Sequence, residues 1–234
     1  MSYRERPYPP VLSAWLECAW QREAGGGSPI RVVPDGCIDI VWTENAGTQI
    51  VGANTTAFVV ELAPATRVAG VRMRPGAGPA LLGIEGVALR DARVAIEDVW
   101  GDEGRRLTAS LDAAGDPAGA LLCVLAARAG RAARPDPLVG AAVARLHEPG
   151  VRVAQLAREL AVSERQLRRR VETAVGYGPK RLARVLRLRR ALDAALAGGD
   201  LGRVAAEAGY ADQAHLTHDC RALAGVAPST MLAA

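Results

Sequence analysis

The 234 residues are enough for one large domain or two small ones, each with a hydrophobic core of its own. Half of the residues are hydrophobic and 23% are charged, which is typical of a soluble globular protein. The chain contains no run of about 18 apolar residues, and its N-terminus lacks the apolar core of a signal peptide. We therefore expect a cytoplasmic protein without a membrane partner.

The formal net charge of +4 is unevenly distributed along the chain. Residues 131–234 carry 17 basic residues against 10 acidic ones, whereas residues 1–130 carry 12 against 15. A basic C-terminal part is expected where a protein binds a polyanion. Lys180 is the only lysine, however, and GC-rich coding would enrich arginine whatever the function. The charge alone therefore does not decide for nucleic-acid binding.

Residues 30–75 are rich in Val, Ile, Thr and Trp with turn residues between them, which predicts a series of strands. The predicted strands are 31–33, 37–42, 50–52, 57–62 and 67–73, with a tight Pro-Asp-Gly turn at 34–36. Residues 76–130 favour helices, with periodic apolar runs at 105–111 and 117–129. We expect an α+β protein whose N-terminal part is a small sheet or barrel with helices behind it.

A stretch rich in Gly, Ala, Arg and Pro at 130–137 has the composition of a linker. It divides the chain into a predicted N-terminal domain of residues 1–130, a linker of residues 131–137 and a C-terminal domain of residues 138–234.

The N-terminal part offers little for catalysis. All three histidines of the chain, His147, His215 and His218, follow the linker. Neither a histidine metal site nor a Ser-His-Asp or Cys-His pair can therefore form within the N-terminal part alone. The four cysteines form no C-x-x-C pair, which argues against a disulfide framework and a cysteine zinc site. We expect no enzyme, no metal and no cofactor.

Three residues of the predicted strand at 37–42 are candidates for lining an effector pocket. Cys37 and Asp39 alternate along the strand and so share one face, where Cys37 could act as a redox or electrophile sensor. The alternative is a buried structural cysteine after the turn, with Asp39 accepting bonds from nearby amides. Trp42 could join the other tryptophans in an aromatic pocket, or it could pack in the core.

After the linker the strand signals stop and apolar residues recur at helical spacing. The predicted helices are 138–146, 153–160, 164–175, 180–197, 201–208 and 213–224. Short breaks with Gly, Pro, Ser or Asp separate them. We expect an all-α domain with short connections.

One pattern occurs twice within these helices, at a spacing of 49 residues. The matching pairs are Ser163 and Asp212, Leu167 and Leu216, Gly176 and Gly225, and Pro179 and Pro228. Each copy has a small residue where two helices would cross (Ala157 or Ala205), then a short turn, an N-cap and an inward leucine. Another kind of helical bundle could show one such copy by chance. Two copies joined by one long helix predict a tandem helix-turn-helix.

The inward leucines determine which side chains face outward from the second helix of each unit. The outward residues are Arg165, Arg168 and Arg169 in the first unit, and Gln213, His215 and His218 in the second. Arg and Gln read the guanine and adenine edges of double-stranded DNA in the major groove. We expect these six residues to face bases.

The C-terminal pattern resembles the tandem helix-turn-helix domain of the AraC/XylS family of transcription regulators. The resemblance rests on 156–167, the Gly-x-x-Pro at 176–179, the arginine-rich stretch 180–197, and the Gly-Tyr-x-Asp-Gln-x-His string at 209–215. It implies a long rigid helix that sets two recognition helices in successive major grooves, with phosphate contacts from Ser163, Thr217 and Arg221.

Three positions of the second recognition helix depart from the family pattern. Leu216 and Cys220 stand where the family usually has Phe, and His218 stands where Arg is common. Histidine makes a weaker and pH-sensitive contact, so we expect the second unit to contribute less to specificity than the first.

Residues 3–127 resemble the uncharacterised domain that precedes such DNA-binding domains in many regulators, through 34–39, 70–76 and 98–101. The resemblance implies a sensory or dimerising domain, here a degenerate cupin-like barrel. It further implies a small-molecule effector, contact with RNA polymerase, activation of transcription and a possible homodimer. Two alternatives are a fused DNA-repair enzyme, whose Pro-Cys-His-Arg site or four-cysteine zinc cluster is absent here, and an architectural DNA binder without sequence preference.

Overall fold

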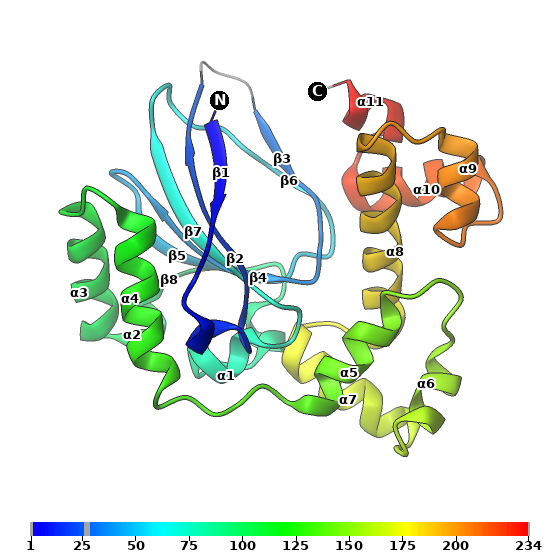
Figure 1. Ribbon diagram of the computed structural model, residues 1–234, viewed down its shortest axis with the longest axis horizontal. Coiled ribbons are helices and arrows are strands. Elements are labelled where there is room, and N and C mark those ends of the chain that lie inside the picture. Colours follow the sequence, from blue (N-terminus) through cyan, green and yellow to red (C-terminus); the bar gives the residue numbers. More distant parts are fainter. Residues whose placement is uncertain (1, 26–28, 234) are drawn as a thin grey trace.

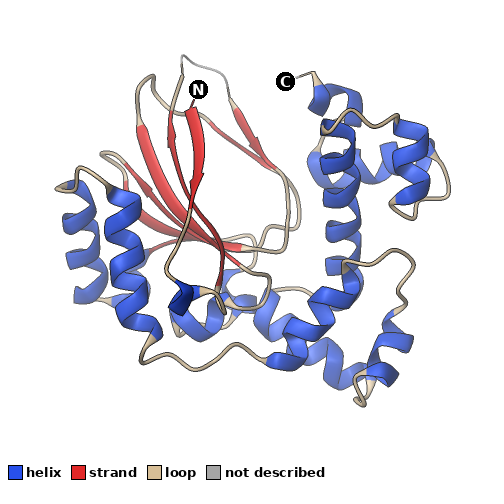
Figure 2. Cartoon of the chain, viewed as in Figure 1, coloured by secondary structure: helices blue, strands red, loops and turns tan. Residues whose placement is uncertain are grey.

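The computed structural model describes residues 2–25 and 29–233 (Figure 1). Strands occupy the N-terminal half and the C-terminal third is helical, which confirms the α+β class expected from the sequence (Figure 2). The two parts lie side by side, with the long helix α8 (Pro179–Leu196) opposite the sheet (Figure 1).

Six antiparallel strands form the main sheet in the order β1-β2-β7-β4-β5-β8. Their bounds are β1 (Ser2–Arg6), β2 (Leu16–Glu23), β4 (Ile38–Thr43), β5 (Gly47–Val51), β7 (Arg67–Met73) and β8 (Arg93–Ala95). Burial alternates along β4: Ile38, Ile40 and Trp42 are buried in a core, and the residues between them are half-buried on the opposite face.

Helices cover the face of the sheet that carries Ile40 and Trp42. Their bounds are η1 (Pro10–Leu12), α1 (Gly78–Leu82), η2 (Gly86–Leu89), α2 (Ile96–Trp100), α3 (Asp102–Asp112) and α4 (Pro117–Ala129). The inward leucines of α3 and α4 share one hydrophobic core with the buried sheet residues. The helices predicted at 105–111 and 117–129 are thus confirmed and lie over the sheet (Figure 1).

A two-stranded antiparallel sheet, β3 (Ile30–Val32) and β6 (Phe58–Val60), stands apart from the main sheet. The strands predicted on both sides of the Pro-Asp-Gly turn are present, but β3 pairs with β6 and not with β4. The Asp35 carboxylate accepts a hydrogen bond from the Cys37 amide at 2.9 Å and so stabilises the turn between the two sheets. Strands β1, β2 and β8 were not predicted.

The C-terminal part consists of α5 (Pro137–Leu146), α6 (Val153–Glu159), α7 (Glu164–Val175), α8, α9 (Leu201–Glu207), α10 (Gln213–Ala224) and α11 (Pro228–Leu232). The six helices predicted from periodicity are confirmed, and α11 is an addition. Both predicted N-caps are also confirmed. The Ser163 hydroxyl accepts from the Gln166 amide at 3.2 Å, and the Asp212 carboxylate accepts from the His215 amide at 2.7 Å.

The turns of the two helix-turn-helix units share one backbone geometry. The amide of Val162 donates to the Ala157 carbonyl at 3.0 Å, and that of Tyr210 donates to the Ala205 carbonyl at 2.8 Å. The residue before each of these amides is left-handed, with φ of 53° at Ala161 and 84° at Gly209. Alanine is strained in this conformation and glycine is not, so the first turn carries strain that the second lacks.

We expect Ala161→Gly to stabilise the protein by about 0.5–1 kcal/mol, because relief of the left-handed strain exceeds the added flexibility of the unfolded chain. The matched variant Gly209→Ala should destabilise by about 1 kcal/mol, because its added Cβ has ordinary contacts and introduces backbone strain alone. Thermal unfolding followed by circular dichroism measures both changes. A lower melting temperature for Ala161→Gly would contradict this account of the turn.

Candidate DNA-binding surface and effector pocket

The first helix-turn-helix unit consists of α6 and α7. Ala157 and Leu167 are buried between the helices, as the sequence predicts for the crossing point and the inward face. Arg165, Arg168 and Arg169 are exposed on the outer face of α7. Arg168 forms an ion pair with Glu172 one turn along at 3.5 Å, on the surface of the same helix. The three arginines therefore form one basic, solvent-facing surface.

The second unit consists of α9 and α10. Ala205 and Leu216 are buried at positions equivalent to those of the first unit. Gln213, His215 and His218 are exposed on α10, as the sequence predicts. The geometry thus brings the six predicted base-facing residues onto the outer faces of two equivalent helices.

The three predicted phosphate contacts differ in the hydrogen bonds they already make. The Ser163 hydroxyl lies 2.9 Å from Gln166 Oε1 and belongs to the capping box of α7. The Thr217 hydroxyl donates to the Gln213 carbonyl at 2.9 Å. Both hydroxyl protons are therefore engaged within the helices. Arg221 is exposed in the last turn of α10 and, among the described residues, forms no ion pair.

The N-terminal domain docks against both units. Gly86 of η2 lies so close to the end of α7 that an added Cβ would be 2.4 Å from the Ala174 carbonyl oxygen, so only glycine fits there. At the other unit, the Ala57 amide donates to the Leu223 carbonyl at 2.7 Å. Arg31 donates to the Ala224 carbonyl at 3.0 Å. These contacts fall at the C-terminal ends of α7 and α10 and leave their base-facing residues exposed.

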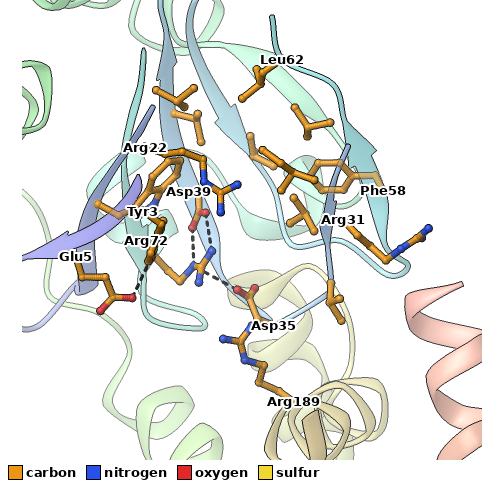
Figure 3. A pocket seen from close by; sticks show the side chains of 18 of the residues that line it. Tyr3, Glu5, Arg22, Arg31, Asp35, Asp39, Phe58, Leu62, Arg72 and Arg189 are labelled. Carbon is orange, nitrogen blue, oxygen red and sulfur yellow. Dashed lines mark hydrogen bonds and ion pairs between the residues drawn. The ribbon is translucent and has the colours of Figure 1, made fainter. Parts of the chain in front are cut away.

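A cavity of about 440 Å³ lies between the main sheet, the β3–β6 sheet, α8 and α11 (Figure 3). Its size suits a small organic molecule. Most of its wall is apolar, and the apolar residues are Trp20, Ile30, Val32, Val33, Val41, Val51, Phe58, Val60, Leu62, Val68, Leu192, Leu196, Met231 and Leu232. The cavity is thus built by both domains, which no local sequence pattern could show.

Five arginines and four carboxylates also line this cavity, and only some of them neutralise each other. Arg72 pairs with Asp35 and Asp39 at 3.3 Å each, and Arg189 pairs with Asp193 at 3.1 Å. Two further arginines, Arg22 and Arg93, form no ion pair with any residue of the described ranges; Arg22 stacks over Tyr3 and Arg93 over Phe58. The buried Nε of Arg22 also has no hydrogen-bond partner there.

Of the three residues predicted for an effector pocket, Asp39 lines the cavity. Cys37 is buried beside Asp35 and Asp39, where burial, together with those carboxylates, raises the pKa of its thiol well above the usual range. This environment disfavours the reactive thiolate and favours the structural alternative for Cys37. Trp42 faces the helical side of the sheet and donates to Asp112 at 2.7 Å, so it packs in the core.

Burial raises the pKa of Asp39 to about 6, although the neighbouring Arg72 opposes this shift. The carboxylate therefore titrates near neutral pH at the floor of the cavity. The described residues contain no group of three or more His, Cys, Asp or Glu side chains placed to hold a metal ion. None of the helices within residues 2–25 and 29–233 has the length and apolar character needed to cross a membrane.

The comparisons with known proteins agree with this geometry. Residues 156–234 match a helix-turn-helix domain family, and residues 4–95 match a domain of unknown function. No curated protein matches the chain. Two crystal structures of ToxT from Vibrio cholerae are similar in fold, each with a TM-score of 0.51 and 11% identity over 99% of this chain and 98% of theirs. One of them is bound to (E)-4-(8-methylnaphthalen-1-yl)but-3-enoic acid.

Two exposed recognition helices on one helical domain, together with the match over 156–234, define a DNA-binding protein of the helix-turn-helix class. The tandem arrangement of the two units around α8 narrows this class. Residues 156–234 form a helix-turn-helix domain of the AraC type.

The raised pKa of Asp39 predicts a pH dependence of folding stability. The folded state holds this proton more tightly than the unfolded chain, so ionisation of Asp39 lowers the unfolding free energy as the pH rises from about 4 to about 6. Between pH 4 and pH 7, the unfolding free energy of the wild type relative to Asp39→Asn should fall by about 2–3 kcal/mol.

Urea denaturation of both proteins at the two pH values measures this difference. Asp98→Asn, on the exposed surface of α2, is the matched control for an Asp-to-Asn change. If the difference in unfolding free energy between the wild type and Asp39→Asn stayed constant from pH 4 to pH 7, Arg72 would fully compensate the buried charge of Asp39.

Proposed function

We propose that this regulator reads a bipartite operator, with α7 in one major groove and α10 in the next. The observation that carries the proposal is the pair of equivalent, exposed recognition faces joined by one continuous helix, α8. Arg165, Arg168 and Arg169 would read one half of the operator. Gln213, His215 and His218 would read the other.

Phosphate contacts would supply the salt-dependent part of the affinity. Arg221 is the better placed of the predicted phosphate ligands, because the hydroxyl protons of Ser163 and Thr217 are engaged within their helices. Backbone amides near the N-termini of α7 and α10 can add to these contacts. Contact with RNA polymerase, activation of transcription and homodimerisation follow from the family and belong to the same proposal, as does the absence of enzymatic activity.

Replacing Arg168 and Arg169 together by alanine should weaken specific DNA binding by about 10- to 100-fold, because each base contact contributes about 1–3 kcal/mol of discrimination. Fluorescence anisotropy at physiological salt measures binding to a duplex from upstream of the gene and to its scrambled counterpart. The control is Arg105→Ala with Arg106→Ala on α3, which removes the same charge far from the recognition helices. Unchanged specific binding by the α7 variant would refute this docking.

We further propose that the interdomain cavity binds a small organic acid as the effector. Its apolar walls would bury the body of the molecule, and Arg22, which forms no ion pair among the described residues, would bind its carboxylate. The acid bound to ToxT has the same chemistry, an apolar ring system with one carboxylate. Because α8 and α11 form part of the wall, an occupied cavity would bias the position of the DNA-binding domain.

The acid bound to ToxT, (E)-4-(8-methylnaphthalen-1-yl)but-3-enoic acid, is a direct probe of this cavity. Titration should change the tryptophan fluorescence saturably, because Trp20 lines the wall. Arg22→Gln should weaken binding about tenfold or more through loss of a charge-assisted bond. Arg106→Gln on α3 should have no effect. Equal binding of the acid and its uncharged primary amide would exclude recognition of the carboxylate.

A further inference from the structure

The second recognition helix carries an acidic residue that faces inward. Asp219 lies on the buried side of α10, with 2% of its surface exposed. Its carboxylate forms an ion pair with Arg184 and accepts from Arg187 at 3.2 Å, both on α8. It also accepts from the hydroxyl of Tyr210 at 2.9 Å. A buried carboxylate is tolerated only where cations and donors compensate its lost hydration, and here three groups do so.

The same network reaches a base-facing side chain. Arg187 lies 4.2 Å from the centre of the Tyr210 ring, which it covers. The Tyr210 ring in turn meets the ring of His215 edge to face, with centroids 5.1 Å apart. His215 is exposed in the first turn of α10, among the residues that would enter the groove. Helix α8 is thus connected through Asp219 and Tyr210 to the base-facing side of α10.

The first recognition helix has a charged anchor at the equivalent position. Arg170 precedes Asp219 by 49 residues, the spacing of the repeat. It donates through Nε to Asp136 at 2.7 Å, and a second bond joins the same two side chains. Asp136 is also the N-cap of α5, the helix that precedes the first unit. One charged residue of each recognition helix therefore forms ion pairs with the helix that precedes its unit or with the N-cap of that helix.

We propose that Asp219 is a positioning residue that sets the rotation of α10 about its axis and so decides which side chains face the DNA. Rotation of α10 would separate the carboxylate from the guanidinium groups of Arg184 and Arg187, which belong to a different helix. Both arginines are only partly exposed, at 36% and 27% of their side chains, so they are not free to follow. Hydrogen-bonded charges specify one geometry more sharply than apolar contacts do.

This inference rests on the proposed reading of DNA by both helices, and one experiment tests the two separately. The full-length protein selects duplexes from a random DNA pool, and the bound sequences are read. The wild type is expected to select two half-sites. Gln213→Ala identifies the half-site that α10 reads, because the sequence preference of this variant weakens at that half-site. Asp219→Asn should then lose discrimination at that half-site about tenfold or more per base pair, with the other half-site unchanged.

Asp136→Asn is the matched control, because asparagine preserves the N-cap of α5 and removes only the charge opposite Arg170. Asp136→Asn should reduce discrimination at the half-site read by α7 and leave discrimination at the half-site read by α10 unchanged. If the role of Asp219 were purely structural, Asp219→Asn would instead reduce discrimination at both half-sites and also lower the melting temperature. If Asp219→Asn does not fold, Tyr210→Phe removes a single bond to the carboxylate, and its loss of discrimination at the α10 half-site should be smaller.

Two outcomes would overturn the inference. If Asp219→Asn, folded by circular dichroism, selects the same two half-sites as the wild type, Asp219 does not position α10 although the proposed docking stands. If the wild type itself selects a single half-site that Gln213→Ala leaves unchanged, both the docking and the positioning role fail.

Discussion

The helix α8 is the constraint on which the functional parts of this protein depend. An 18-residue α-helix spans about 27 Å as one nearly rigid rod. Its buried side contributes Leu182, Leu186 and Leu188 to the core shared by both helix-turn-helix units. Nearer its C-terminal end, Leu192 and Leu196 line the cavity, and Leu192 also belongs to that core. Any change in how α8 meets the N-terminal domain is therefore transmitted to the recognition helices, because a packed helix moves as a body.

The docking between the domains indicates what kind of regulation the fold permits. Its contacts lie at the C-terminal ends of α7 and α10, and the base-facing residues remain in solvent. The N-terminal domain consequently does not block the reading faces. It contacts the C-terminal end of each recognition helix instead, through Gly86 at α7 and through Arg31 and Ala57 at α10.

Ion pairs inside the fold join elements that are far apart in the sequence. Arg72 and its two carboxylates join β7 to β4 and to the turn before it, at the floor of the cavity. Gly36 of that turn lies against Leu182 of α8, where an added Cβ would come within 2.9 Å. The turn beside the cavity therefore also contacts α8, the helix that joins the two helix-turn-helix units.

The sequence by itself determined the helical domain, because helix-turn-helix signals are local: the caps at Ser163 and Asp212, the inward leucines and the turns lie within about ten residues. The sequence also indicated that Trp42 and Asp39 lie on opposite faces of their strand, because an odd spacing along a strand places two side chains on opposite faces. Only the tertiary structure decided that β3 pairs with β6, which residues form the cavity and what surrounds Asp219. Those features bring together residues from distant parts of the chain, such as Tyr3 and Leu232, which line the same cavity. Their proximity depends on how whole domains pack, and such packing produces no periodic pattern in the sequence.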